Sequence, residues 1–363
     1  MRITRSVILL LILSPLFGIP LEATCTGTSV SAFGARGDGH TDDTAAIQSA
    51  ISAAAATGGG SVVFSVARYY TTGTLLVPQG VVLCGAIEGP FDVSGVDPAV
   101  TTFAPTLLVT NTSAPFVTLN GLGAGVTDLL FHYPNQVGIN ASVPILYPYT
   151  IVTSSPGTKV VRSTVTNAYN FLDIESGRVI AQDLFIGAFN IGVNIDHAHD
   201  HVTLRNLLYS VFWDVMQNVN NPPTTIDNWV MSHGIALVVN RVDGLEVHDF
   251  NVFFRFAGIL LTDSPDATQN PRCGYGTGSD IDLDIMQYGI IATASSAQGY
   301  QFTNLDVTTA AGKAGVQLRA GGSVAPDVLI NGGSEVGNWA LGAFPTAAAG
   351  NLSVVNIIGF NLP

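Results

Sequence analysis

Along most of the chain, one six-residue phrase recurs: an apolar residue, any residue, an apolar residue, any residue, an Asn or Asp, and a final apolar residue. We call the position of the Asn or Asp the polar slot. A period of two is typical of β-strands, whose successive side chains point to opposite faces, and not of helices. Copies of this phrase are Ala124-x-Val126-x-Asp128-Leu129, Val179-x-Ala181-x-Asp183-Leu184, Val202-x-Leu204-x-Asn206-Leu207, Leu245-x-Val247-x-Asp249-Phe250, Tyr300-x-Phe302-x-Asn304-Leu305, Leu352-x-Val354-x-Asn356-Ile357, and the variant Ile281-x-Leu283-x-Ile285-Met286, whose polar slot is apolar. The alternation predicts a fold made of many short strands.

The spacing of the phrase indicates how the strands are arranged. The slots at residues 183, 206, 249, 285 and 304 lie 23, 43, 36 and 19 residues apart, and units near 20–25 residues with insertions are typical of a solenoid. Leucine-rich repeats have a similar period, but their Leu-x-x-Leu-x-Leu pattern and their helical half are missing from this sequence. We therefore expect an all-β fold, a single-stranded right-handed parallel β-helix. Each slot residue should lie at a bend, where its side chain can bond the backbone of the turn and its neighbours above and below.

The first part of the mature chain has a helical pattern instead. Residues 44–56 carry an apolar stripe at Ala46, Ile47, Ala50, Ile51 and Ala54. One of residues 42–44 (Asp, Asp, Thr) can cap the helix start, and three glycines from residue 58 end it. An amphipathic helix at this place would cover the open end of a solenoid. We expect one domain over residues 24–363, with the cap and first coils at 33–85 and the repeating coils at 120–363.

The N-terminus has the pattern of a secretory signal. Arg2 and Arg5 precede an apolar run over residues 7–19, which is shorter than the ~20 residues that a membrane span needs. We expect residues 1–23 to be a signal peptide and the protein to be secreted, into the periplasm or the medium, with no membrane span. The three cysteines, Cys25, Cys84 and Cys273, allow one disulfide and leave one thiol over; the pairing stays open.

Composition excludes some classes of protein. Only 11% of residues are charged and 47% are hydrophobic, which argues against intrinsic disorder. The 13 Lys and Arg face 26 Asp and Glu, for a net charge of −13. Nucleic acid is therefore not an expected partner, because phosphate binding needs a basic surface.

Two stretches resemble known families. Gly37-Asp-Gly39, Thr41-Asp-Asp-Thr44 and Gly58-Gly-Gly60 are similar to the start of the pectate-lyase superfamily (pectin-lyase-like right-handed β-helix proteins), which includes hydrolases, lyases, epimerases and phage tailspikes. Tyr133-Pro-Asn-Gln136 and Asn167-Ala-Tyr-Asn170 resemble bacterial proteins related to polygalacturonase-type glycosidases of family 28. The resemblance implies an exported, carbohydrate-active β-helix with a polysaccharide as its partner.

The polygalacturonase resemblance also suggests catalytic residues. Asn194-Ile-Asp196 is similar to the Asn-Thr-Asp motif of those enzymes, and Ser232-His233-Gly234 is loosely similar to their Gly-His-Gly motif. No Asp-Asp pair follows, although Asp200 could replace one of its members, and no Arg-Ile-Lys motif is present. The catalytic candidates are Asp196, Asp200, His233, Asp214 and Asp263, and the substrate-binding candidates are His199, Trp213, Trp229, Arg241 and Arg255.

Glycosidic hydrolysis needs one carboxylic acid to protonate the leaving oxygen and one carboxylate to act on water or on the sugar. Their separation is ~6.5–9.5 Å for inversion and ~5–5.5 Å for retention. Coils stack ~4.8 Å apart, so outward carboxylates one or two coils apart meet either requirement. Aromatic side chains such as Trp229 can stack on sugar rings.

A rival site is Asp280-Ile-Asp282-Leu-Asp284, whose alternation places three carboxylates on one outer face and Ile281, Leu283 and Ile285 inward. These carboxylates could bind Ca²⁺ in a polysaccharide lyase, with an arginine as base; no other cofactor is expected. A glycoside hydrolase is the favoured interpretation, a calcium-dependent lyase the runner-up, and a non-catalytic carbohydrate-binding or adhesive β-helix the third. Whether the protein is a monomer or a trimer stays open.

Overall fold

The structure, a computed structural model, describes residues 25–136, 138, 141–210, 224–310, 313, 315–319, 321–336 and 351–355. The predicted signal peptide and two site candidates, Trp213 and Asp214, lie outside these ranges. Within them, no helix has the length and apolar character that crossing a bilayer requires.

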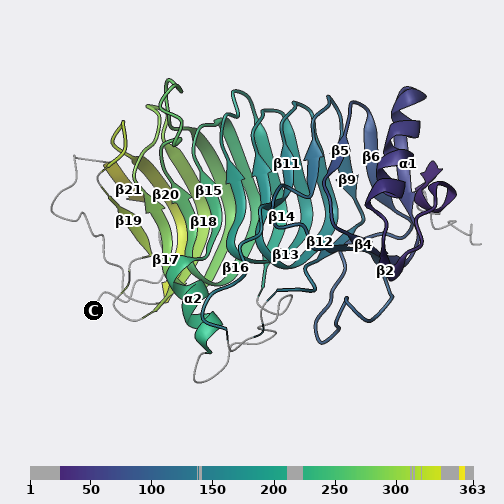
Figure 1. Cartoon of the computed structure of the whole chain (residues 1–363). Helices are drawn as coiled ribbons and strands as arrows, with labels where there is room; N and C mark the ends of the chain where they lie inside the picture. The colour runs from purple at the N-terminus through teal and green to yellow at the C-terminus, as the bar shows by residue number, and fades with distance from the viewer. Residues whose placement is uncertain are drawn as a thin grey trace, which may run out of the picture.

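Short parallel strands stack into one continuous solenoid (Figure 1). Each coil pairs in parallel with the next, which confirms the predicted β-helix architecture. The strands are β1 Thr28–Ser29, β2 Asp38–Asp42, β3 Gly60–Phe64, β4 Ala67–Thr71, β5 Leu75–Val77, β6 Val81–Gly85, β7 Pro105–Val109, β8 Val117–Leu119, β9 Gly125–Thr127, β10 Leu130–His132, β11 Tyr149–Thr153, β12 Lys159–Ile174, β13 Val179–Ile195, β14 Val202–Tyr209, β15 Ile235–Val239, β16 Asp243–Leu261, β17 Tyr275–Ala292, β18 Tyr300–Thr309, β19 Val316–Leu318, β20 Asp327–Val336 and β21 Asn351–Val355. The helices are η1 Val30–Phe33, α1 Thr44–Ala56 and α2 Thr225–His233.

Coil after coil bends at one position, where a residue takes the left-handed conformation that Asn and Asp tolerate best. The strand register stacks these residues in a single row, which we call the bend stack. It consists of Asp128, Arg162, Asp183, Asn206, Asp249, Asp280 and Asn304, with φ between 44° and 61°. The slot residues therefore lie at bends, as the repeat predicts.

One slot assignment from the sequence is wrong. Phe250 pairs with Ile281 and Ile281 with Leu305, so the residue that stacks between Asp249 and Asn304 is Asp280 and not Ile285. Ile285 lies at a second left-handed bend (φ 54°) and is 36% exposed instead of inward. The alternation misled because it ignores this second bend, which turns the strand between Leu283 and Met286, both buried.

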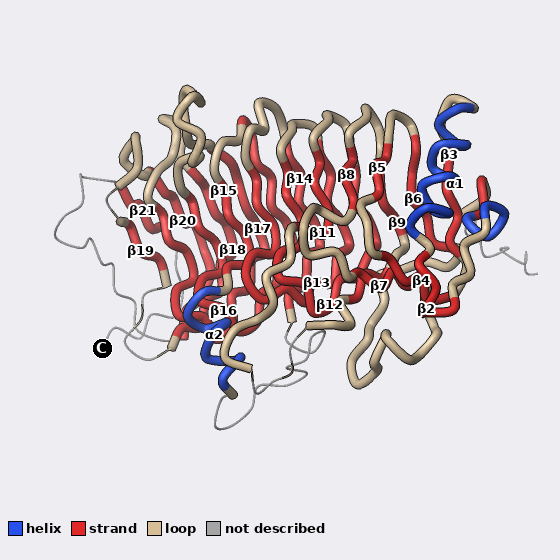
Figure 2. Tube along the Cα trace, in the orientation of Figure 1, coloured by secondary structure: helices blue, strands red, loops and turns tan. Residues whose placement is uncertain are grey.

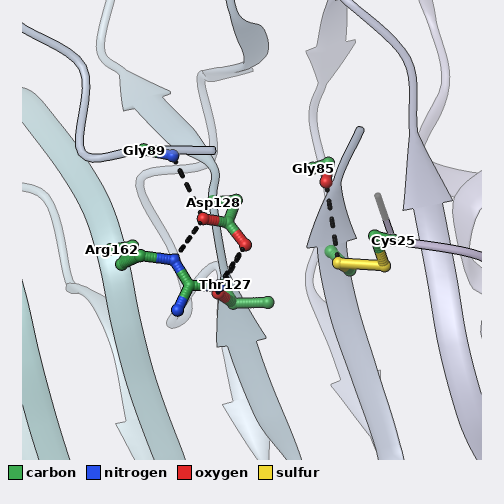
Figure 3. The surroundings of a disulfide bond; sticks show 7 residues. Cys25, Gly85, Gly89, Thr127, Asp128 and Arg162 are labelled. Carbon is green, nitrogen blue, oxygen red and sulfur yellow. Dashed lines mark hydrogen bonds and ion pairs between the residues drawn. A yellow bond between two sulfur atoms is a disulfide. The ribbon is translucent and has the colours of Figure 1, made fainter. Parts of the chain in front are cut away.

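Bonds between coils hold the bend stack together. The Asn206 amide donates to Asp183 Oδ1 at 2.8 Å, and the Asn304 amide donates to Asp280 Oδ1 at 2.7 Å. In the first coils a guanidinium replaces the amide, because Arg162 Nε donates to Asp128 Oδ1 at 2.7 Å (Figure 3). Each carboxylate in these pairs has a neutral or cationic partner, so the stack is architectural.

The inward residues form one core along the length of the solenoid. Its columns are the inward members of the repeat, such as Val202, Leu204 and Val247, each at most 1% exposed. In a later coil a glycine takes an inward position: a Cβ on Gly278 would lie 2.7 Å from the ring of Phe302. The core therefore alternates glycine and aromatic residues between coils where side chains would collide.

The N-terminal helix α1 lies at the purple end of the stack (Figure 1), and Ile47, Ala50, Ile51 and Ala54 are its buried side. Asp43 precedes the helix, yet its carboxylate accepts hydrogen bonds from the backbone N–H groups of Arg36 (2.7 Å) and Gly37 (3.0 Å) and not from the helix. Asp43 thus fixes the preceding loop, and burial raises its pKa.

Cys25 and Cys84 form a disulfide that ties the start of the described chain to β6 (Figure 3). Cys273 is a buried free thiol. The structure thus shows which two of the three cysteines form the disulfide, which the sequence alone did not decide.

Candidate functional site

One outer face of the solenoid is formed by β8, β11, β15, β19 and the C-terminal parts of β12, β13, β16 and β17 (Figure 2). Asp173, Asn194 and Val238 pair in register. Asp173 and Asn194 are half-buried, whereas the preceding residues Leu172, Val193 and Leu237 are fully buried. The Asn194 amide donates to Asp173 Oδ1 at 2.8 Å. The Asn240 amide in turn donates to Asn194 Oδ1 at 2.9 Å. A polar ladder therefore crosses three coils of this face.

Asp173 has an unusual environment for a carboxyl group. Burial raises its pKa from 3.8 to about 7, the hydrogen bond from Asn194 lowers it, and the nearby charges of Glu175 and Asp196 raise it further. Glu175, two residues further along the chain, is thus the nearest carboxyl that acts on Asp173. A carboxyl group that keeps its proton near neutral pH beside a second carboxylate is the arrangement of a general acid.

Glu175 lies between Asp173 and a histidine. Nδ1 of His197 lies 2.8 Å from Glu175 Oε2, an ion-pair contact that is not aligned as a hydrogen bond. Nε2 of the same ring lies 3.1 Å from Asp266 Oδ2. The hydrogen bond with Asp266 raises the pKa of His197, as do the charges of Asp196 and Glu175, against the effect of burial. A protonated His197 places a positive charge beside Glu175.

Asp266 reaches this site on a loop that follows β16 and folds back over earlier coils. Ser264 in the same loop donates to Asp196 Oδ2 at 2.8 Å, and Arg272 Nε donates to the Ser264 carbonyl at 3.0 Å. The backbone N–H of Thr268 is the main cause of a lowered pKa at Asp266. The loop therefore brings an ionised carboxylate to His197.

Asp196, the first catalytic candidate from the sequence, is only 3% exposed. Its Oδ1 accepts from the backbone N–H groups of His197 (2.8 Å) and Arg241 (3.3 Å), and its Oδ2 accepts from Ser264. Its oxygens are thus occupied by turn and loop donors. Asp196 lies in the site, but its bonds are those of a residue that positions others.

Two other carboxylate candidates lie on turns. Asp200 is exposed, and its Oδ2 lies 3.3 Å from Nε of Arg178. Asp263 accepts from the backbone N–H of Ser323 (2.6 Å) and from the Ser323 hydroxyl (2.8 Å). Neither has a carboxyl neighbour comparable to the Asp173–Glu175 pair.

Helix α2 presents the aromatic candidates, and it packs through Ile226 and Val230 against Phe189 and Phe254. The rings of Trp229 and His233 stack with centroids 4.5 Å apart and planes 7° apart. Tyr169, four residues before Asp173 on β12, lies 5.9 Å from the Trp229 ring. The helix therefore holds a half-buried indole next to the strand that carries Asp173. His199 is exposed, on the turn after His197.

The two arginine candidates are both buried. Arg241 is 5% exposed and binds Asp243 through two nitrogens, at 2.5 and 2.8 Å. Arg255 is 1% exposed, with its guanidinium 5.6 Å from the centre of the Tyr209 ring. Neither guanidinium is presented to solvent on the face of Asp173.

The acidic candidates Asp280, Asp282 and Asp284 lie elsewhere. Asp280 belongs to the bend stack, and Asp282 has a pKa that burial raises, with smaller contributions from Asp284 and Asp306. An open groove of about 280 Å³ is lined by Asp249, Asn251, Asp280, Ile281, Asp282, Asn304 and Asp306. Among the described residues, no three His, Cys, Asp or Glu side chains converge as metal ligands.

Three residues of the site were absent from the sequence-based candidates: Asp173, Glu175 and Asp266. Register supplies a signal for two of them, because Asp173-Ile-Glu175 occupies the positions of Asn194-Ile-Asp196 one coil earlier. Comparing neighbouring coils at the same outward position would have found this pair. Nothing in the sequence marks Asp266, because its place depends on how the loop folds back.

Comparisons with known proteins agree with this architecture. The chain resembles an exopolygalacturonase from Thermotoga maritima (10% identity, TM-score 0.52, covering 91% of this chain and 86% of that one). It also resembles the C387A mutant of DFA-IIIase from Arthrobacter chlorophenolicus A6 (10%, 0.52, 92% and 84%). Tailspike protein 2 of Escherichia coli O157:H7 bacteriophage CAB120 is similar too (12%, 0.54, 91%), although the match spans only 42% of that chain. At such identities the likeness shows the fold alone.

No curated protein sequence matches the chain. Residues 27–234, more than half of the protein, match the family described as "Rhamnogalacturonase A/epimerase, pectate lyase-like". The chain belongs to this family of carbohydrate-active, pectate-lyase-like β-helix proteins.

Proposed function

We propose that the protein is a glycoside hydrolase in which Asp173 is the general acid and Glu175 the assisting carboxylate. The observation that carries this proposal is the environment of Asp173 on the outer face: burial, together with the neighbouring Glu175 and Asp196, raises the pKa of its carboxyl to about 7. Two carboxyls held in different protonation states are what hydrolysis of a glycosidic bond requires.

The roles follow from the surroundings of each group. Asp173 keeps its proton because it is buried and surrounded by negative charge, so it can protonate the leaving glycosidic oxygen. Glu175 lies beside His197, which orients its side chain, and is the carboxylate that removes a proton from water or attacks the sugar. The Glu175 side chain is 31% exposed and rotates about three bonds, so a sugar between the two groups can widen the pair to the ~5–9.5 Å that hydrolysis uses.

The surroundings of the pair suit a polysaccharide. Trp229 and Tyr169 lie along the same part of the fold and offer aromatic faces for sugar rings. A disulfide in this chain is consistent with export, because such bonds persist in oxidising compartments. We further propose that α1 covers the open N-terminal end of the coils.

Elimination by a lyase is a weaker candidate. It needs an arginine base that reaches the substrate, whereas Arg241 is bound to Asp243 and Arg255 is 1% exposed. Arg205 is exposed, but it lies on β14 next to the bend stack and not on the face of Asp173. The site also gathers carboxylates, which disfavour a uronate substrate at the point of cleavage.

The test is a panel of polysaccharides (uronans, galactans, arabinans, xylans and mannans) incubated with the mature protein. New reducing ends measure hydrolysis, and ultraviolet absorbance measures the unsaturated sugar that elimination leaves. We expect reducing ends without absorbance. Asp173→Asn and Glu175→Gln should each lower the rate by about 10²–10⁴-fold, and Asp183→Asn in the bend stack is the matched control that should not.

Each other outcome has a clear meaning. Absorbance that rises with the reducing ends would replace the hydrolase by a lyase. Full activity in Asp173→Asn would show that the acid lies elsewhere. Binding without turnover on every polymer would support the non-catalytic carbohydrate binder.

A further inference from the structure

A second concave surface lies on another outer face, beyond the turn that follows Asp196. This groove has a volume of about 270 Å³, close to the lower end of the ~300–1,000 Å³ of small-molecule sites. It is lined by His201, Gly244, Leu245, Glu246, Tyr275, Gly276, Thr277, Gln298, Gly299 and Gln301. None of the candidates in the Asp173 site belongs to it, so it is a separate feature.

The strand register builds the groove. Glu246, Thr277 and Gln301 are paired neighbours on β16, β17 and β18, so three polar side chains stand in a row across three coils. The inward residues on either side of Gln301, Tyr300 and Phe302, are each 2% exposed. The row is thus held by a packed core and forms a rigid polar surface.

Glycines leave room for the side chains at the edge of this row. Gly244 has φ 88°, and a Cβ there would lie 3.2 Å from Nδ1 of His201. His201 can therefore lie against the backbone while its Nε2 lies 3.2 Å from Glu246 Oε2. The edge of the groove consequently presents a histidine and a carboxylate that are paired with each other.

The chemistry of the lining suits an uncharged sugar. Tyr275 supplies an aromatic ring, and the side chains of Gln298, Gln301 and Thr277 supply donors and acceptors for hydroxyl groups. The lining contains no Lys or Arg. A uronate would meet Glu246 without a free cation to bind its carboxylate.

We propose that this groove is a second carbohydrate-binding site, for one uncharged sugar unit of a polysaccharide. This proposal rests on the carbohydrate-active family of the chain and on the lining of the groove, and it does not require that Asp173 be the general acid. The turn from His197 to His201 connects it with the carboxyl pair, and the segment from Asp266 to Tyr275 makes a second connection.

The test is affinity electrophoresis of the full protein in native gels that contain galactan, arabinan, xylan, mannan or polygalacturonate. We expect at least one neutral polymer to retard the protein more than polygalacturonate does. Tyr275→Ala and Gln301→Ala should each weaken that retardation about 3- to 10-fold, and Thr303→Ala, at the next outward position of β18, should leave it unchanged. Mobility in polymer-free gels and thermal unfolding check that every variant is folded.

The outcomes separate this proposal from the hydrolase. Retardation that is unchanged in Tyr275→Ala and Gln301→Ala, absent for every polymer, or strongest for polygalacturonate would overturn the groove site. Asp173→Asn should retain the retardation even though it loses turnover. Loss of retardation in the groove variants of a protein that cuts no polymer would support the groove and overturn the hydrolase alone.

Discussion

Two regions of this solenoid use the same kinds of residue at coil spacing and arrive at opposite properties. In the bend stack, Asp183 faces the amide of Asn206 and Asp280 faces the amide of Asn304. On the face that we propose as catalytic, Asp173 has an amide partner in Asn194 as well, but it also meets the carboxyl of Glu175.

The difference lies in the partners and in the backbone. Each bonded carboxylate of the bend stack has an amide or guanidinium of a neighbouring coil opposite it, and its residue takes a left-handed φ at a bend. Asp173 lies in an extended strand, where its side chain does no work for the backbone. The residue type therefore does not distinguish architecture from chemistry. The pKa does: the hydrogen bond with Asn304 lowers the pKa of Asp280 even though Asp249 stacks beside it, whereas burial raises the pKa of Asp173.

Asp196 tests where the boundary between the two regions lies. Asp196→Ala removes the acceptor of two backbone N–H groups and of the Ser264 hydroxyl, all in a buried place. Unsatisfied buried donors are costly, so we expect a loss of about 3 kcal/mol in the free energy of unfolding. Thermal and urea unfolding at neutral pH measure it.

Asp196→Asn is the control, since its carbonyl oxygen can still accept the two backbone bonds that Oδ1 accepts in the wild type. We expect a smaller loss of stability and measurable turnover from this variant. If Asp196→Asn were fully stable and inactive, Asp196 would belong with Asp173 and Glu175 as a catalytic residue, as the Asn194-Ile-Asp196 motif suggested.

The raised pKa of Asp173 predicts a pH dependence that the bend stack should not share. A carboxyl whose pKa is about 7 in the folded protein and ~3.9 when unfolded keeps its proton longer in the fold, so its contribution to stability is present below pH ~4 and is lost as the pH rises to ~7. Asp173→Asn removes this dependence and keeps an acceptor oxygen for the Asn194 amide. We therefore expect the variant to gain on the order of 2 kcal/mol relative to the wild type between pH 4 and pH 8, measured by urea unfolding.

The rate of turnover should depend on the same proton of Asp173. The rate on a cleavable polymer should fall as the pH rises through about 7, where Asp173 loses the proton that it donates. Asp183→Asn, compared over the same range, should parallel the wild type in both measurements. A stability difference at Asp173 that did not change with pH would contradict the protonated acid.

The fold was largely predictable because it repeats. Inward residues such as Val202, Leu204 and Val247 recur with a period of two, and the polar slot marks the bends. The error at Ile285 shows the limit: periodicity fixes which residues alternate, but not where a strand turns a second corner. Register with the neighbouring coils, which puts Asp280 beside Asn304, is needed to correct it.

The site was harder to predict, for a physical reason. Its proposed reactive pair is distinguished by burial and by proximity between side chains, and neither is written in the local pattern of Asp173 and Glu175. Asp266 lies 69 positions after its partner His197 and reaches it only because a loop folds back. The motif search came close, since Asn194 and Asp196 lie one coil away from Asp173 and Glu175. A sequence motif, however, does not show which side chains lie close together in the folded protein.

The smallest expected effect sharpens the comparison most, because it makes the same chemical change in the bend stack. Asp183 accepts from Asn206 at 2.8 Å and from Gln182 at 2.9 Å, at φ 54°. Asp183→Asn keeps an acceptor oxygen and a residue that tolerates this φ, so we expect a change below about 0.5 kcal/mol in unfolding free energy and no change in turnover. Asp183→Val, which loses both bonds and puts a β-branched residue at a left-handed bend, should cost about 2–3 kcal/mol. If Asp183→Asn instead abolished turnover while the fold stayed intact, the bend stack would carry chemistry, and the distinction drawn from partners and backbone would fail.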